Sequence, residues 1–228
     1  MYADLISTVT VFEDRPYRNI KGVRVTQNLY DDLGEEEEDV LAAVAAENLG
    51  KLEPRNPFIR RPFEYDVIAY PFVYENWQQT RFSDGSRYGV WYGSLEIETT
   101  LFETVHHWRK FLLEIYPDED REIVSDRRVI RAFCQGVLVD LRGKETTWPA
   151  LIADGYEFTQ PLGAYLRSQN LNGLLVRSAR CEGTNLASFT PDILSNPEDV
   201  CYLTYRFNPK RRGPILIERA AGVAWMEI

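Results

Sequence analysis

The sequence predicts a single α+β domain, built on a strongly bent mixed sheet with flanking helices. Two observations lead to this prediction. Apolar strand-like runs and amphipathic helical runs follow one another without the strict strand, helix, strand repetition that characterises a parallel sheet. The chain has 228 residues, of which 44% are hydrophobic and 27% charged, so it is globular in composition and long enough to bury one real core. One domain with an extension is favoured over two very small domains.

We divide the chain into an N-terminal extension, residues 1–55, and a main domain, residues 56–228. The boundary rests on the segment 54–62, PRNPFIRRP, whose three prolines indicate a stiff extended connection. Residues 1–34 give only weak strand or loop signals. An acidic run at 35–39, followed by good helix formers and a glycine at position 50, predicts one helix over about residues 36–49.

The main domain contains one long predicted helix and several short strands. Apolar residues recur at steps of three and four over residues 96–116, which predicts an amphipathic helix with Ser94 as its N-cap. Glu103 and His107 lie off the apolar stripe of that helix, one turn apart. Shorter helices are expected to begin at Thr147 and Thr159. Strands are expected at residues 65–70, 129–133, 136–141, 174–178, 186–189, 200–207 and 214–218.

Charge and cysteine content exclude several classes of protein. The formal net charge of −9 disfavours binding to nucleic acid or to an anionic membrane by the protein itself. No apolar run approaches the length of a membrane span, and no secretory signal is visible at the start of the sequence. Three widely spaced cysteines argue against a disulfide scaffold and favour a reducing compartment, so a cytoplasmic location is expected.

Familiar metal and cofactor signatures are missing from the sequence. The two histidines, His106 and His107, are adjacent on the predicted helix, so they point in different directions and cannot share a metal ion. No P-loop, GxGxxG or GxSxG motif occurs. We therefore expect neither a metal nor a cofactor.

Five spaced clusters resemble the signature of a known family. Residues 81–83 read RFS, residues 89–94 read GVWYGS and residues 100–107 read TLFETVHH, with LVRSAR at 175–180 and GTNL at 183–186. Together, over roughly residues 56–207, they resemble the RES domain, the toxin half of RES-Xre toxin-antitoxin pairs. The Arg, Glu and Ser that give the family its name would be Arg81, Glu103 and Ser178.

This resemblance implies a fold similar to ADP-ribosyltransferase toxins and an enzyme that degrades NAD+. Its reaction would be phosphorolysis or hydrolysis of the nicotinamide-ribose bond, with NAD+ as substrate and inorganic phosphate as co-substrate in the first case. The implied partner is a cognate Xre-family antitoxin. Two other interpretations stay open, namely transfer of ADP-ribose to a protein and a catalytically silent binding module. The sequence also leaves open whether the protein forms a homo-oligomer.

The chemistry of NAD+ explains why the family pattern uses these residue types. Nicotinamide in NAD+ is a pyridinium, so it departs as a neutral base and leaves a cationic sugar. A carboxylate beside the ribose stabilises that cation, and the resemblance assigns this role to Glu103. Guanidinium groups match the oxygens of a pyrophosphate, which indicates Arg81 with Arg60 or Arg61 as a second clamp. We expect Glu103 and Arg81 to converge on one pocket sized for a dinucleotide.

Three further side chains complete the predicted site. The ring of Tyr92 would face the pyridinium, or its hydroxyl would meet a ribose oxygen. Ser178 would orient Glu103 or the ribose through one hydrogen bond, and Asn185 would support the neighbouring loop. Taken alone, each residue has an ordinary structural interpretation, such as a surface pair for Glu103 and His107 or a core position for Tyr92.

Overall fold

The structure is a computed structural model that describes residues 2, 4–22, 65–220 and 222–228. These residues form one nine-stranded sheet in the order β2-β3-β6-β5-β4-β7-β8-β9, in which β1 pairs with β4 and β2 also pairs with β4. Among the described strands only the β4–β5 pair is parallel, so the sheet is mixed. The strands are β1 (Val9–Asp14), β2 (Tyr17–Lys21), β3 (Trp91–Ser94), β4 (Ile123–Asp140), β5 (Gly173–Arg177), β6 (Thr184–Ser188), β7 (Leu194–Phe207), β8 (Leu216–Ala220) and β9 (Val223–Glu227).

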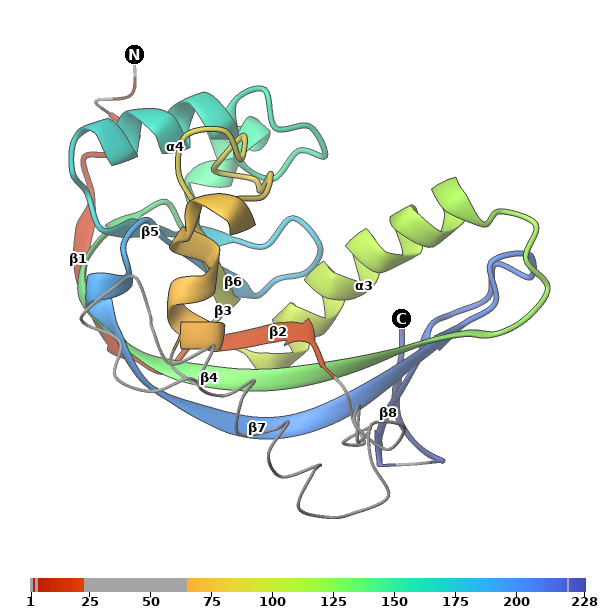
Figure 1. Ribbon diagram of the computed structural model, residues 1–228. Helices are drawn as coiled ribbons and strands as arrows, with labels where there is room; N and C mark the ends of the chain where they lie inside the picture. The colour runs from red at the N-terminus through yellow and green to blue at the C-terminus, as the bar shows by residue number, and fades with distance from the viewer. Residues whose placement is uncertain (1, 3, 23–64, 221) are drawn as a thin grey trace, which may run out of the picture.

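Two long strands give the sheet its curvature. β4 and β7 pair antiparallel from Ile123 opposite Phe207 to Cys134 opposite Leu194, and the pairing shifts register twice along the way. Such irregularities bend a strand and increase its local twist. Figure 1 shows the curved pair, with the helices α3 (Ile97–Ile115) and α4 (Thr159–Ser168) on its concave side. The predicted α+β class with a bent mixed sheet and flanking helices is confirmed.

The first two strands of the chain belong to the same sheet as the main domain. β1 pairs with residues 134–139 of β4, and β2 pairs with residues 127–131 of that strand. Residues 9–14 and 17–21 of the expected extension therefore contribute two strands to the central sheet. The helix predicted over 36–49 and the boundary near residue 55 lie outside the described residues.

The long helix α3 forms because its apolar stripe is buried against the sheet. Leu101, Val105 and Leu112 are each at most 2% exposed, and they share one core cluster with residues of β7 and β8. The helix predicted over residues 96–116 is confirmed. Its start differs from the prediction, since Glu96 occupies the N-cap position and Ser94 is the last residue of β3.

Residues 65–76 form short helical turns, although a strand was predicted over residues 65–70. A π-helical turn covers Tyr65–Ala69, and 3₁₀ turns follow at Tyr70–Phe72 and Tyr74–Asn76. The strand prediction was wrong because a short buried apolar run looks the same in both conformations. Val67 is fully buried, and its carbonyl oxygen accepts a hydrogen bond of 2.8 Å from Nε1 of Trp91 on β3.

The other predicted strands are present, with changes in extent. The two strands expected between residues 129 and 141 are one continuous strand, β4, which begins at Ile123. The four strands expected further along the chain correspond to β5, β6, β7 and β8, and β9 was not predicted. A 3₁₀ turn at Pro149–Leu151 stands where a helix was expected after Thr147, whereas α4 begins at Thr159 as predicted.

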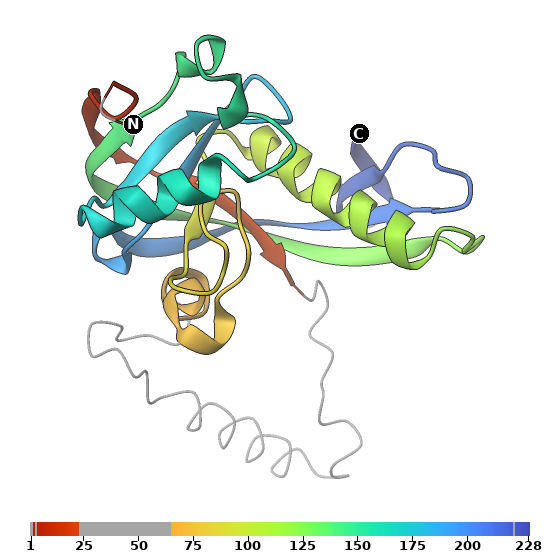
Figure 2. The same cartoon turned by 90° about the horizontal axis from the view of Figure 1, so that it is seen from above.

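Helix α4 packs closely on the segment that carries Arg81. Leu162 and Leu166 of this helix are fully buried in one core cluster with Phe82. Between them Gly163 allows backbone contact, since a side-chain carbon there would lie 2.1 Å from the carbonyl oxygen of Phe82. Seen from above, α3 and α4 both lie over the sheet (Figure 2). No helix within the described ranges has the length and apolar character needed to cross a membrane.

Candidate functional site

A cavity of about 910 Å³ lies between β2, β3 and the first half of α3. Its volume is within the range of small-molecule sites. Arg81, Tyr92 and Glu103 are on its lining, so the structure brings three of the predicted site residues to one space. Ser178 and Asn185 are not on the lining, but both contact Glu103 directly.

Glu103 stands in the cavity wall with one carboxylate oxygen held by the protein and the other left for a ligand. The residue is 8% exposed. Oε1 accepts two hydrogen bonds of 2.6 Å, one from Oγ of Ser178 and one from Nδ2 of Asn185. Oε2 has no hydrogen-bond partner among the described residues, and no cation there forms an ion pair with the carboxylate. Two neutral donors therefore fix the carboxylate without neutralising it.

Asn185 connects Glu103 to the neighbouring strand β3. It lies on β6 directly opposite Ser94. Its Oδ1 accepts a hydrogen bond of 2.7 Å from Oγ of Ser94, which sets the orientation of the amide. Nδ2 then donates to Glu103 at 2.6 Å and to the hydroxyl of Tyr92 at 3.0 Å. The amide uses its acceptor and both donors, so its contact with the acid is more direct than the loop support expected from the sequence.

Tyr92 offers a neutral hydroxyl to the cavity. The hydroxyl oxygen accepts the N–H of Asn185, so its own proton stays available for a ligand. Burial raises the pKa of Tyr92 well above its ordinary value, and the nearby charge of Glu103 raises this pKa further. The phenol consequently stays protonated at any working pH. The adjacent Trp91 faces the opposite side of the sheet, because successive strand residues alternate in direction. On that side it is fully buried in the core.

Ser178 holds Glu103 from behind the cavity wall. It follows β5, and its backbone N–H donates to the carbonyl oxygen of Gly183 at 2.7 Å across the turn that leads to β6. Its Oγ accepts the backbone N–H of Arg180 at 3.0 Å and donates to Glu103. The serine is 1% exposed and is absent from the cavity lining, so it is a positioning residue for the carboxylate and not a ligand contact.

Arg81 lines the cavity, but part of its guanidinium is used within the protein. Nη1 donates to the carbonyl oxygens of Leu151 at 3.3 Å and Ala153 at 2.7 Å. The Cζ atom lies 5.2 Å from the centre of the Tyr156 ring. Nε and Nη2 make no hydrogen bond to a described residue, which leaves two nitrogens for an anion. Arg81 therefore anchors the loop before α4 as well as facing the cavity.

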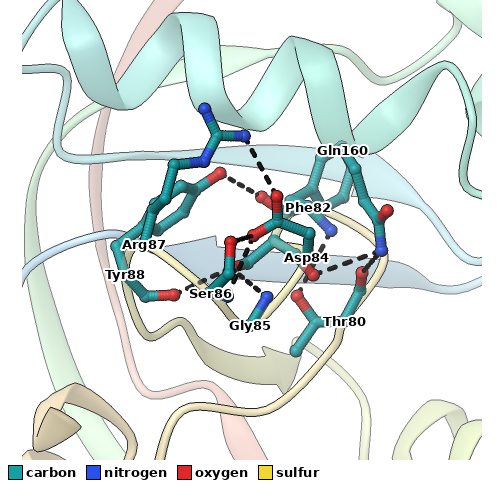
Figure 3. Close-up of polar contacts among 9 residues, drawn as sticks. Thr80, Phe82, Asp84, Gly85, Ser86, Arg87, Tyr88 and Gln160 are labelled. Atoms are coloured by element: carbon teal, nitrogen blue, oxygen red, sulfur yellow. Dashed lines mark hydrogen bonds and ion pairs between the residues drawn. The ribbon is translucent and has the colours of Figure 1, made fainter.

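Figure 3 shows the turn that follows Arg81. Its hydrogen bonds and backbone conformation explain why the turn contains Ser83 and Gly85. Oγ of Ser83 donates to the carbonyl oxygen of Tyr88 at 2.7 Å and accepts the N–H of Gly85 at 3.1 Å. Gly85 has a φ of +76°, a left-handed conformation that favours glycine. Nε2 of Gln160 on α4 donates to the carbonyl oxygens of Thr80 and Ser83, which ties the turn to the helix. These contacts fix the backbone on both sides of the arginine.

The lining residues that were not predicted as ligand contacts include Arg18, Tyr156 and His107. Arg18 comes from β2 and Tyr156 from the loop before α4, and neither belongs to a sequence cluster that could have identified it. His107 lies one helical turn after Glu103 and had been considered only as its surface pair. Partial desolvation at the cavity lowers the pKa of His107, so its imidazole is neutral at neutral pH.

The second phosphate clamp and a metal site are not seen among the described residues. Arg60 and Arg61, the alternatives for a second phosphate clamp, lie outside the described residues. Within the part of the chain that the structure describes, no group of three or more histidine, cysteine, aspartate and glutamate side chains is arranged to hold a metal ion. The arrangement that remains is a carboxylate, a phenol and guanidinium groups around one cavity.

Comparisons with known proteins add a family match. A family model described as the RES domain matches residues 58–208, a range that contains Arg81, Glu103 and Ser178. Among solved structures, the chain is similar to the M. tuberculosis MbcT-MbcA toxin-antitoxin complex, with 13% sequence identity, a TM-score of 0.41, and coverage of 84% of this chain and 86% of that chain. No curated protein matches the sequence.

Proposed function

The chain belongs to the RES domain family, and from this membership we propose that it cleaves the nicotinamide-ribose bond of NAD+ by phosphorolysis or hydrolysis. The observation that carries the proposal is the carboxylate of Glu103. It lies on the cavity wall, accepts hydrogen bonds only from neutral donors, and has no cationic partner among the described residues. A negative charge held in this way is suited to a cation that develops within the cavity.

The reaction moves positive charge from the nicotinamide ring to the ribose. The pyridinium leaves as a neutral base, so no general acid is required. Oε2 of Glu103 would face the developing sugar cation or accept a ribose hydroxyl, while Ser178 and Asn185 keep Oε1 in place. The hydroxyl of Tyr92, whose proton is not used within the protein, would donate to a ribose oxygen. Arg81 would bind the pyrophosphate through Nε and Nη2.

We assign the enzyme to the toxin half of a toxin-antitoxin pair, with a cognate Xre-family antitoxin as its partner and the cytoplasm as its location. The resemblance to RES-Xre pairs supports this assignment. The formal net charge of −9 is consistent with a target other than nucleic acid. The antitoxin would act by covering the cavity. Expression of the free protein should therefore arrest growth and lower cellular NAD+.

The direct test is incubation of the purified protein with NAD+, with and without inorganic phosphate. Free nicotinamide should appear in at least one condition. Phosphorolysis would give ADP-ribose phosphorylated at the anomeric carbon, hydrolysis would give ADP-ribose, and transfer would add the mass of ADP-ribose to a protein. Tight nucleotide binding without nicotinamide release would favour a silent binding module and contradict the proposal.

Replacing Ser178 by alanine should lower kcat for nicotinamide release about tenfold or more and leave KM nearly unchanged. Oε1 of Glu103 would keep only the hydrogen bond from Asn185, and a hydrogen bond to a charged group contributes about 1.5–3 kcal/mol. Ser168→Ala is the matched control, because that hydroxyl bonds only the end of α4 at the surface. A variant that raises KM at constant kcat would show that Ser178 contacts the substrate instead.

A further inference from the structure

Arg18 is a cation of the cavity that has no hydrogen-bond or ion-pair partner among the described residues. It lies on β2 and lines the cavity, and its Nη1 is buried without a hydrogen-bond partner in the described part of the chain. The other described arginines of the lining all have partners. Arg81 donates to two carbonyl oxygens, Arg127 donates to Asn19, and Arg128 pairs with Asp199. Arg18 is half-buried and thus keeps donors that no described residue uses, one of which, Nη1, is shielded from water.

The surroundings hold this guanidinium without using its donors. Its Cζ atom lies 5.5 Å from the centre of the ring of Trp91, which is fully buried. An aromatic face attracts a cation but leaves the N–H groups in the guanidinium plane free for other partners. Burial lowers the pKa of Arg18 to about 10, so the side chain still carries its charge at neutral pH. A half-buried charge with a buried Nη1 that has no hydrogen-bond partner is unfavourable, which points to an anion that completes the site.

The position of Arg18 suits an extended ligand. The next residue on β2, Asn19, also lines the cavity, and it bonds the hydroxyl of Tyr205 beneath α3. Because successive strand residues face opposite sides of a sheet, the cavity reaches both faces at this edge. β2 meets β3 at a single residue pair, which leaves this edge open. A ligand can therefore have one end at Glu103 and an anionic group at Arg18.

We propose that Arg18 binds a phosphate group within the cavity, in addition to Arg81. This inference rests on the proposed function and deepens it by naming the residue that meets the ligand's anionic part. The shared chemistry is a phosphate oxygen, supplied either by the pyrophosphate of the dinucleotide or by inorganic phosphate as co-substrate. Arg18 precedes residues 58–208, the range matched by the RES domain. The assignment therefore rests on the contacts of Arg18 and not on the family resemblance.

Calorimetric titration of the full-length protein with pyrophosphate, inorganic phosphate and ADP-ribose tests this site without turnover. Arg18→Met should weaken binding of at least one of the three about tenfold or more, and Arg18→Lys should lie between it and the native protein, because lysine keeps the charge but loses the planar fork. Without ligand, Arg18→Met should melt at or above the native temperature, because it removes a half-buried charge that has no ion-pair partner among the described residues. Arg15→Met is the control, since Arg15 pairs with Glu198 at the surface.

The outcomes separate the two phosphate sources. Weaker binding of ADP-ribose and pyrophosphate assigns Arg18 to the dinucleotide, and weaker binding of inorganic phosphate alone assigns it to the co-substrate. The proposal is overturned if the native protein binds none of the three, if Arg18→Met binds all of them normally or melts below the native protein, or if Arg15→Met loses as much affinity. If Arg18→Met loses ADP-ribose binding while the native protein releases no nicotinamide, the phosphate site stands and NAD+ cleavage is rejected.

Discussion

Replacing Glu103 by glutamine should reduce kcat for nicotinamide release by about 10²- to 10³-fold and leave the fold intact. Glutamine has nearly the same shape and keeps an oxygen that can accept from Ser178 and Asn185. It removes the negative charge that would face the sugar cation. Because that cation exists only as the bond to nicotinamide breaks, the loss should fall on kcat while KM changes little.

Glu98→Gln is the matched control for this substitution, because Glu98 is an exposed carboxylate in the first turn of the same helix. Steady-state kinetics and thermal melting of the native protein and both variants measure the effect. Full activity in Glu103→Gln would remove the carboxylate from the mechanism. In cells, expression of this variant should no longer deplete NAD+, whereas Glu98→Gln should deplete it as the native protein does.

Local periodicity predicted the long helix, whereas the first two strands depend on distant partners. The apolar stripe of α3 is visible within one stretch of sequence, so its extent could be predicted within a residue at each end. β1 could not be assigned to the central sheet because Val9 pairs with Val139, far along the chain. The strand predicted at residues 65–70 was wrong for a different reason, since a buried apolar run fits a helical turn as well as a strand.

The spaced sequence clusters identified the candidate site residues, whereas the hydrogen bonds between those residues could be seen only in the folded structure. The position of Glu103 off the apolar stripe predicted that it could face a cavity, and the cavity is there. That Asn185 and Ser178 both bond the same oxygen follows from the hairpin of β5 and β6, whose register no single motif contains. Nothing in the sequence near Arg81 indicated that its Nη1 donates a hydrogen bond to the carbonyl oxygen of Leu151.

Gly163→Ala should destabilise the protein by about 1–3 kcal/mol, although alanine is the better helix former by about 1 kcal/mol. The added methyl group would lie 2.1 Å from the carbonyl oxygen of Phe82 and 3.0 Å from its Cβ. A backbone carbonyl cannot rotate away as a flexible side chain can, so α4 and the segment of Phe82 must separate. Phe82 is adjacent to Arg81, and the shift should therefore also move the guanidinium that faces the cavity.

Gly213→Ala provides the control, because a side-chain carbon at that position meets nothing within 4 Å. Denaturant unfolding should show a lower midpoint for Gly163→Ala and no loss for Gly213→Ala. Nicotinamide release should show a raised KM for NAD+ in Gly163→Ala alone, since Arg81 would contact the pyrophosphate before and during the reaction. A lower midpoint with a native KM would mean that the turn around Ser83 and Gly85 holds the arginine without help from α4. Native values for both would mean that α4 can retreat from Phe82 without cost, contrary to the close packing of the two backbones.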